Sequence, residues 1–94
     1  MRTTEKWFKE SMIDAMVVIY SDCMDDVGIE NCVDDIAENL NFNCTPLEFV
    51  KKHNGIYEVN KAIRKILPGY LPTEKLDDVK LLNFYTELLT NWGR

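Results

Sequence analysis

The sequence predicts an all-α protein, a compact bundle of about five helices that includes a helix-turn-helix-like unit. Apolar side chains recur at spacings of three and four residues along most of the chain, as they do on the buried side of a helix. The three prolines and four glycines lie at the boundaries of these segments, and no segment alternates as a strand does. A chain of 94 residues has room for one hydrophobic core, so we expect a single domain over residues 1–94.

The first predicted helix covers residues 4–24, with Thr3 or Thr4 as its N-cap and Gly28 at or after its end. Its buried stripe consists of Phe8, Met12, Ala15, Met16, Ile19 and Cys23. Further apolar side chains lie outside this stripe, namely Trp7, Val17, Val18 and Tyr20. We therefore expect this helix to be central or to contact a partner.

The second predicted helix covers residues 30–40, and the third covers residues 46–53. The second helix turns its apolar residues inward, namely Cys32, Val33, Ile36, Ala37 and Leu40. Thr45 is a suitable N-cap for the third helix, and Pro46 suits the first helical position. Asn54 and Gly55 end this helix because both residues tolerate a left-handed backbone.

The fourth predicted helix covers residues 56–67 and ends at Pro68 and Gly69, and the fifth covers residues 74–91 with Thr73 as its N-cap. The fifth helix carries two apolar stripes. The first contains Leu76, Val79, Leu82 or Asn83, Tyr85 or Thr86, and Leu89, and the second contains Leu81, Phe84, Leu88 and Trp92. Two stripes predict a helix that is covered on both sides, and the stripe that ends at Trp92 is the predicted contact of a homodimer.

Charge is distributed unevenly along the chain, which has a net charge of −5. Residues 1–40 contain 3 basic and 10 acidic side chains, whereas residues 41–94 contain 8 basic and 6 acidic ones. The acidic first half is repelled by nucleic-acid phosphates and attracted to a basic protein surface. The chain has no signal-peptide pattern and no apolar run long enough to span a membrane, so we expect a cytoplasmic protein whose cysteines stay reduced.

No pattern in the sequence predicts an enzyme, a cofactor or a metal site. Cys23, Cys32, Cys44 and His53 are separated by 8, 11 and 8 residues, whereas zinc sites normally include a close pair of ligands. The acidic run around Gly28 does not place oxygen ligands at the positions of a calcium-binding EF-hand loop. His53 is the one histidine and has no recognisable nucleophile beside it in sequence.

Residues 33–50 resemble a helix-turn-helix unit. Ala37 is small where two helices would cross, Leu40 and Phe42 flank the turn residue Asn41, and Leu47 and Val50 would pack the second helix. The resemblance implies a DNA-binding transcriptional regulator as the alternative function. Its nucleic-acid contacts would be Lys51, Lys52, His53, Lys61, Arg64 and Lys65. The acids of the preceding helix and the small number of cations oppose this alternative.

The interpretation that we favour is a small acidic protein that docks on a larger protein and inhibits or regulates it, like the inhibitor and immunity proteins that phages and mobile elements encode. The acids expected to dock on a basic partner surface are Asp25, Asp26, Asp34, Asp35 and Glu38. The rings expected to be available for the same partner are Trp7, Tyr20 and Trp92, since such residues are enriched where proteins bind one another.

Overall fold

The computed structural model describes residues 3–52 and 57–93. This part of the chain forms five α-helices, α1 (Thr4–Tyr20), α2 (Asp26–Ala37), α3 (Pro46–Lys52), α4 (Tyr57–Ile66) and α5 (Asp78–Trp92). Two short 3₁₀ turns, η1 (Leu67–Gly69) and η2 (Thr73–Lys75), lie between α4 and α5. The described residues contain no strand, and the predicted fold class, an all-α bundle, is confirmed.

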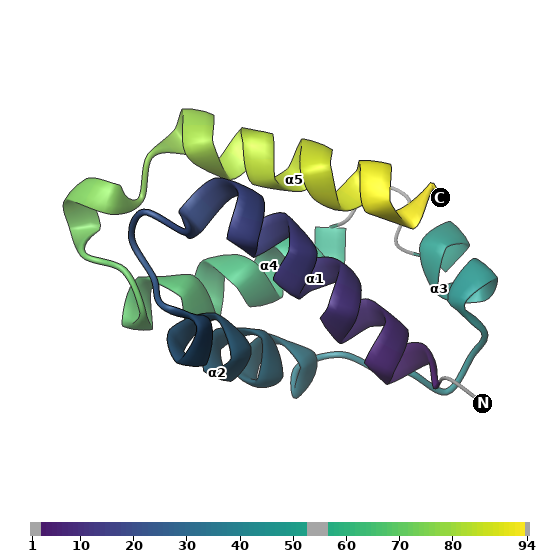
Figure 1. Cartoon of the computed structure of the whole chain (residues 1–94). Coiled ribbons are helices and arrows are strands. Elements are labelled where there is room, and N and C mark those ends of the chain that lie inside the picture. Colours follow the sequence, from purple (N-terminus) through teal and green to yellow (C-terminus); the bar gives the residue numbers. More distant parts are fainter. Residues whose placement is uncertain (1–2, 53–56, 94) are drawn as a thin grey trace.

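The central helix is α1. Figure 1 shows it crossing the front of the molecule, with α5 above it, α2 below it and α4 behind it. Its main packing partners are α2 and α5, while α4 packs against α2. The short α3 lies beside the first half of α1, near the end of α5. Because α1 and α5 run in opposite directions, the start of each helix lies next to the end of the other (Figure 1).

The boundary between α1 and α2 differs from the prediction. α1 ends at Tyr20, and α2 begins already at Asp26, inside the segment that was expected to separate them. The Asp25 carboxylate accepts a hydrogen bond of 2.7 Å from the Gly28 N–H and caps α2. A Cβ atom on Gly28 would lie 2.9 Å from that carboxylate oxygen. Gly28 follows α1, as one of the two expectations had it, but it does so from within α2, where it makes room for the helix cap.

Other helix caps follow the same chemistry. The predicted cap Thr3 accepts a hydrogen bond of 3.1 Å from the Lys6 N–H. α5 starts at Asp78, later than predicted, because the Asp77 carboxylate accepts a hydrogen bond of 2.8 Å from the Val79 N–H. Thr45 caps α3 as predicted.

A reciprocal pair of hydrogen bonds strengthens the start of α3. The Glu48 N–H donates to the Thr45 hydroxyl over 3.2 Å, and the Thr45 N–H donates to the Glu48 carboxylate over 3.3 Å. Such a capping box satisfies two backbone donors at once. It helps to explain how a helix of 7 residues persists, since isolated short helices are unstable in water.

The core takes large side chains from every helix. Those that are fully buried are Phe8, Met12, Met16 and Tyr20 of α1, Ile29, Val33 and Ile36 of α2, Phe49 of α3, Val59 and Ile63 of α4, and Phe84 and Leu88 of α5. The apolar stripe predicted for α1 thus faces inward over most of its length.

Five aromatic rings, which we call the ring cluster, join α1, α3 and α5. They are Trp7, Phe8, Phe42, Phe49 and Trp92. The centroid of Phe49 lies 5.3 Å from that of Phe8, 5.4 Å from Phe42, 5.8 Å from Trp92 and 6.0 Å from Trp7. These separations are typical of favourable ring pairs. The Trp92 indole N–H also donates a hydrogen bond of 3.2 Å to the buried Ser11 hydroxyl.

The segment that resembles a helix-turn-helix does not fold as one. Residues 38–45 separate α2 from α3, which is longer than the tight turn of that motif. The main neighbour of α3 is α1, because Phe49 packs among the rings of α1 and α5. The helix-turn-helix prediction is corrected accordingly.

The two apolar stripes of α5 have different environments. Phe84, Leu88 and Trp92 are buried inside the bundle, so the stripe expected to form a homodimer contact is already covered. The other stripe faces outward, with Val79 66% exposed and Leu82 62% exposed. The prediction of a helix covered on both sides was wrong for the chain by itself.

Candidate protein-docking face

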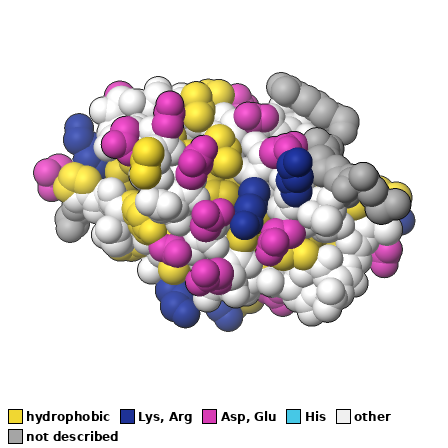
Figure 2. Space-filling view, turned by 60° about the horizontal axis from the view of Figure 1, so that its bottom comes forward, with side chains coloured by type: hydrophobic (Ala, Val, Ile, Leu, Met, Phe, Trp, Pro, Cys, Tyr) yellow, Lys and Arg dark blue, Asp and Glu magenta, His cyan; other side chains and the backbone are white. Residues whose placement is uncertain are grey.

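The acidic side chains of the first half of the chain gather over the outward sides of α1 and α2. We call this surface the acidic face, and its exposed members are Glu10 and Asp14 of α1 and Asp26, Glu30, Asp34 and Glu38 of α2. Figure 2 shows acidic side chains spread across this side of the molecule, with hydrophobic and a few basic side chains between them. The acidic run of the sequence therefore lies on the outer surfaces of two neighbouring helices.

Three of the five acids that were predicted to dock on a partner have structural partners within the chain. Asp25 caps α2, as described above. Asp34 forms an ion pair of 3.2 Å with Lys9 of α1. Asp35 accepts a hydrogen bond from the Tyr70 hydroxyl. These contacts link α1, α2 and the turn after α4, so the three acids contribute to the fold whatever else they bind.

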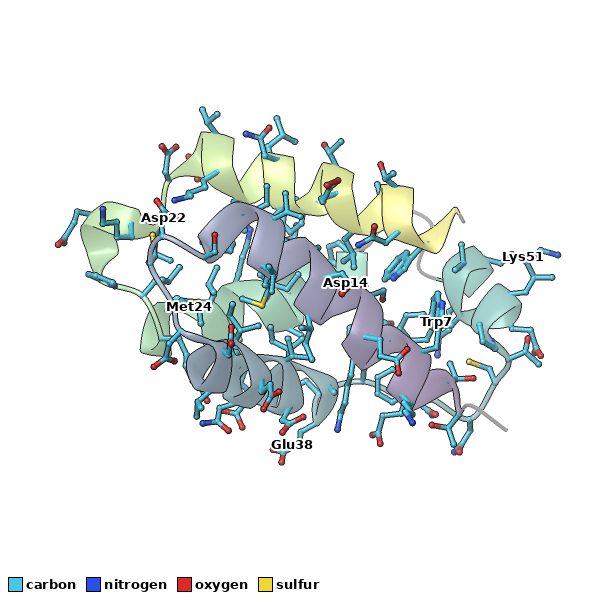
Figure 3. The ribbon with its side chains drawn as sticks, in the orientation of Figure 1. Trp7, Asp14, Asp22, Met24, Glu38 and Lys51 are labelled. Carbon is cyan, nitrogen blue, oxygen red and sulfur yellow. The ribbon has the colours of Figure 1, made fainter. Side chains whose placement is uncertain are left out.

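The remaining two predicted acids, Asp26 and Glu38, are exposed and form no ion pair with a described residue. Asp14 and Glu30 are likewise exposed and form no ion pair with a described residue, but they were not among the predicted docking residues. In Figure 3, Asp14 lies on the front of α1 and Glu38 points away from the bundle below α2. Glu30 was part of the acidic run in the sequence, but Asp14 joins this surface only through the packing of α1 beside α2.

Apolar side chains are exposed on the same two helices. Val17 of α1 is 43% exposed, and Val27 of α2 is 64% exposed. Protein interfaces commonly combine an apolar centre with a polar and charged rim. The acidic face thus offers both kinds of contact that a partner protein uses.

Two of the three rings expected to bind a partner are core residues. Tyr20 and Trp92 are buried, so the expectation that they are available to a partner is corrected. Trp7 is partly buried, with its ring 6.0 Å from those of Phe49 and Trp92. Figure 3 shows Trp7 between α1 and α3, where it serves the ring cluster. The sequence suggested spare rings because it does not show that distant aromatics pack on one another.

Several titratable groups have raised pKa values for identifiable reasons. Burial raises the pKa of the Cys32 thiol to about 12, which keeps it protonated and unreactive. The hydrogen bond to Asp35 raises the pKa of Tyr70 to about 12. These shifts arise from burial and from a hydrogen bond between packed side chains.

The basic residues of the alternative function are divided between two helices. Lys51 and Lys52 are exposed at the end of α3, and Figure 3 shows Lys51 pointing away from the bundle. Lys61, Arg64 and Lys65 are exposed on α4. His53 lies outside the described residues. With α3 packed on α1, these side chains do not form the two-helix surface that a helix-turn-helix presents to DNA.

Within residues 3–52 and 57–93, no three His, Cys, Asp or Glu side chains come together as the ligands of a metal ion would. None of the described helices has both the length and the apolar character needed to cross a lipid bilayer. No protein-family model, curated protein or solved structure matches this chain.

Proposed function

We propose that this protein is a non-enzymatic binding protein that docks through its acidic face on a basic surface of a larger protein and thereby inhibits or regulates it. The observation that carries the proposal is the group of exposed acids on α1 and α2, of which Asp14, Asp26, Glu30 and Glu38 form no ion pair with a described residue. Unpaired surface charge of one sign attracts a surface of the opposite sign.

The mechanism follows from what each kind of contact contributes. Exposed charges on the rim of an interface mainly speed association and select a partner of complementary charge. The exposed valines of the same helices, Val17 and Val27, supply apolar area that association would remove from water. Inhibition then results from occupancy, because the docked bundle covers the basic surface that the partner needs for its own ligand.

The test is a charge-neutralising triple variant with a matched control. Asp14→Asn, Glu30→Gln and Glu38→Gln remove three charges from the acidic face. Asp78→Asn, Glu74→Gln and Glu87→Gln remove the same charges from the segment around α5. A partner captured from the native cell and identified by mass spectrometry is produced separately, and its association rate with each variant is measured at low and high salt.

We expect the acidic-face variant to slow association by at least about tenfold at low salt, with a smaller difference at high salt, because salt screens exposed charges. The control variant should associate like the wild type. Equal rates for the wild type and the acidic-face variant would refute the proposal. Recovery of nucleic acid in place of a protein would favour the alternative of a DNA-binding regulator that uses Lys51, Lys52, Lys61, Arg64 and Lys65.

The homodimer is also part of the proposal, now through the outward stripe of α5. Val79, Leu82, Thr86 and Leu89 follow one another at spacings of three, four and three residues, which is the spacing of a seam between two paired helices. The four residues of this seam carry no charge, so a basic surface would form no ion pair with them. A second copy supplies the same apolar seam, as symmetric dimers require.

Light scattering tests this contact. The wild type should have the mass of a dimer at high protein concentration, and Leu82→Glu should have the mass of a monomer. Val27→Glu places the same charge on an equally exposed residue of α2 and should remain a dimer. A monomeric wild type at all concentrations would contradict this part of the proposal.

A further inference from the structure

A small cavity lies where the end of α1 meets α4, η1 and the segment that leads into α5. Its volume is about 120 Å³. Its wall is mostly apolar, with Ile63 of α4, Leu67 of η1, and Leu76 and Leu81 on the opposite side. Arg64, Asp77 and Asp78 also line it, so side chains of both charges border the cavity.

Tyr20 lines the same cavity and has an unusual hydroxyl group. Its side chain is buried, with 1% of the residue exposed, yet its hydroxyl forms no hydrogen bond with a described residue. Two other tyrosines show the normal arrangement, since the Tyr70 hydroxyl donates to Asp35 and the Tyr85 hydroxyl donates to Asn60. A buried hydroxyl without a partner destabilises a protein by about 1–3 kcal/mol, so its missing partner requires an explanation.

Tyr20 is one of the residues that line the cavity, together with Ile63 and Leu67 on the neighbouring elements. Burial is the largest cause of the rise in the pKa of Tyr20 to about 12, followed by the charges of Tyr85 and Cys23 and then that of Asp77. Asp77 lines the cavity. The residue that carries the unpartnered hydroxyl therefore borders the unfilled volume.

We propose that this cavity is a binding site for a neutral molecule of about one ring in size, apolar except for a single hydroxyl or carbonyl group that hydrogen-bonds to the Tyr20 hydroxyl. The volume sets the size, because an apolar cavity of about 150 Å³ accommodates benzene. The wall of Ile63, Leu67, Leu76 and Leu81 requires an apolar body. The hydroxyl of Tyr20 requires one polar atom.

The charges around the cavity favour a neutral ligand. The Asp77 carboxylate is already bound to the Val79 N–H at the start of α5, and the Arg64 guanidinium donates a hydrogen bond of 3.0 Å to the Asn60 side chain. A charged ligand would lose its hydration against an apolar wall, and because Arg64 and Asp78 border the cavity with opposite charges, a ligand charge of either sign would be attracted by one and repelled by the other. This site is separate from the acidic face, so it does not depend on the proposed docking function.

Phenol and benzene provide a matched pair of probes. Both fit the expected size, and they differ by the hydroxyl group that would reach Tyr20. Binding is followed by two-dimensional NMR titration of the wild type, of Tyr20→Phe, and of Tyr57→Phe as a control that removes a hydroxyl from an exposed tyrosine. The spectra also report whether each variant is folded.

We expect phenol to shift the amide signals of residues around the cavity and to bind more tightly than benzene in the wild type. Tyr20→Phe should weaken phenol binding by about 3–10-fold, the value of one hydrogen bond, and should leave benzene binding unchanged. Tyr57→Phe should change neither. The proposal is overturned if phenol leaves these signals unmoved, as it would if water alone fills the cavity. Equal binding of phenol to the wild type and to Tyr20→Phe would overturn it as well.

Discussion

The two ends of the antiparallel pair α1–α5 are built in different ways. At one end, the start of α1 meets the end of α5 through the ring cluster, where Phe49 touches four other rings and the Trp92 N–H is bonded to Ser11. At the other end, the contacts are a Tyr20–Phe84 ring pair at 5.7 Å and a surface bond of 3.0 Å between Lys80 and Asp22. The cavity lies at this second end.

The two ends of the core therefore differ in how completely they are packed. At the end that holds the ring cluster, the side chains are closely packed and the buried indole N–H of Trp92 is hydrogen-bonded, and both features stabilise the fold. The cavity end contains unfilled volume bordered by Tyr20, whose hydroxyl has no partner among the described residues, and both features reduce stability. Substitutions at the two ends should therefore change the free energy of unfolding by different amounts.

Phe49→Ala should cause the largest loss of stability. Truncating a fully buried ring at the centre of the ring cluster should lower the free energy of unfolding by about 3–5 kcal/mol. Urea unfolding followed by circular dichroism measures the loss. Leu47→Ala on the same helix is the control, since Leu47 is exposed and its truncation should change stability by no more than about 0.5 kcal/mol. Similar losses for both variants would contradict the central place of Phe49.

Ser11→Ala should come next. It leaves the buried Trp92 indole N–H without its acceptor, so we expect a loss of about 1–3 kcal/mol in the same unfolding experiment. Thr90→Ala removes an exposed hydroxyl from α5, which is bonded only to the backbone of its own helix, and should change stability little. If Ser11→Ala is as stable as the wild type, the bond between the two helices is not significant.

Tyr20→Phe should have a smaller effect and in the opposite direction. Because the hydroxyl has no partner among the described residues, removing it should leave the free energy of unfolding unchanged or raise it by up to about 1 kcal/mol. Thermal unfolding without added ligand measures this change. A clear loss of stability would show that the hydroxyl is bonded within the protein.

The smallest expected effect concerns stability at high pH, and no change is expected near neutral pH. The pKa values of Cys32 and Tyr70 rise to about 12 in the folded protein, from ordinary values of 9.0 and 10.0. At high pH the unfolded chain loses these protons first, so stability is fully present below pH 9 and falls as the pH rises toward 12. Unfolding experiments at a series of alkaline pH values measure this loss of stability. Tyr70→Phe removes one of the two titrating groups, so it should reduce the loss that occurs above pH 10. A stability that is constant across this range would contradict the assigned contacts.

Much of the fold could be predicted from the sequence, because helix periodicity and capping are local properties. Stripes such as that of Phe8, Met12 and Met16 are buried as expected. The helix ends were harder to predict. Both Asp25 and Asp77 act as caps, and nearby residues offered plausible alternatives.

The candidate site was predicted only in part, because it depends on how helices pack. Which stripe of α5 faces inward is decided by α1, and the sequence of α5 does not contain that information. The burial of Trp92 likewise depends on Phe49 and Trp7, which are far away along the chain. Asp14 was missed for the same reason, since it belongs to the acidic face only when α1 lies beside α2.

The bond between Trp92 and Ser11 joins residues that are 81 positions apart. Bringing two such distant points of a chain together costs conformational entropy, but this cost grows only slowly with the length of the enclosed loop. The ring cluster does not restrict the unfolded chain as a covalent cross-link would, so its contacts have to offset this closure cost each time the chain folds. In the folded state, the rings and this bond close nearly the whole polypeptide into one loop.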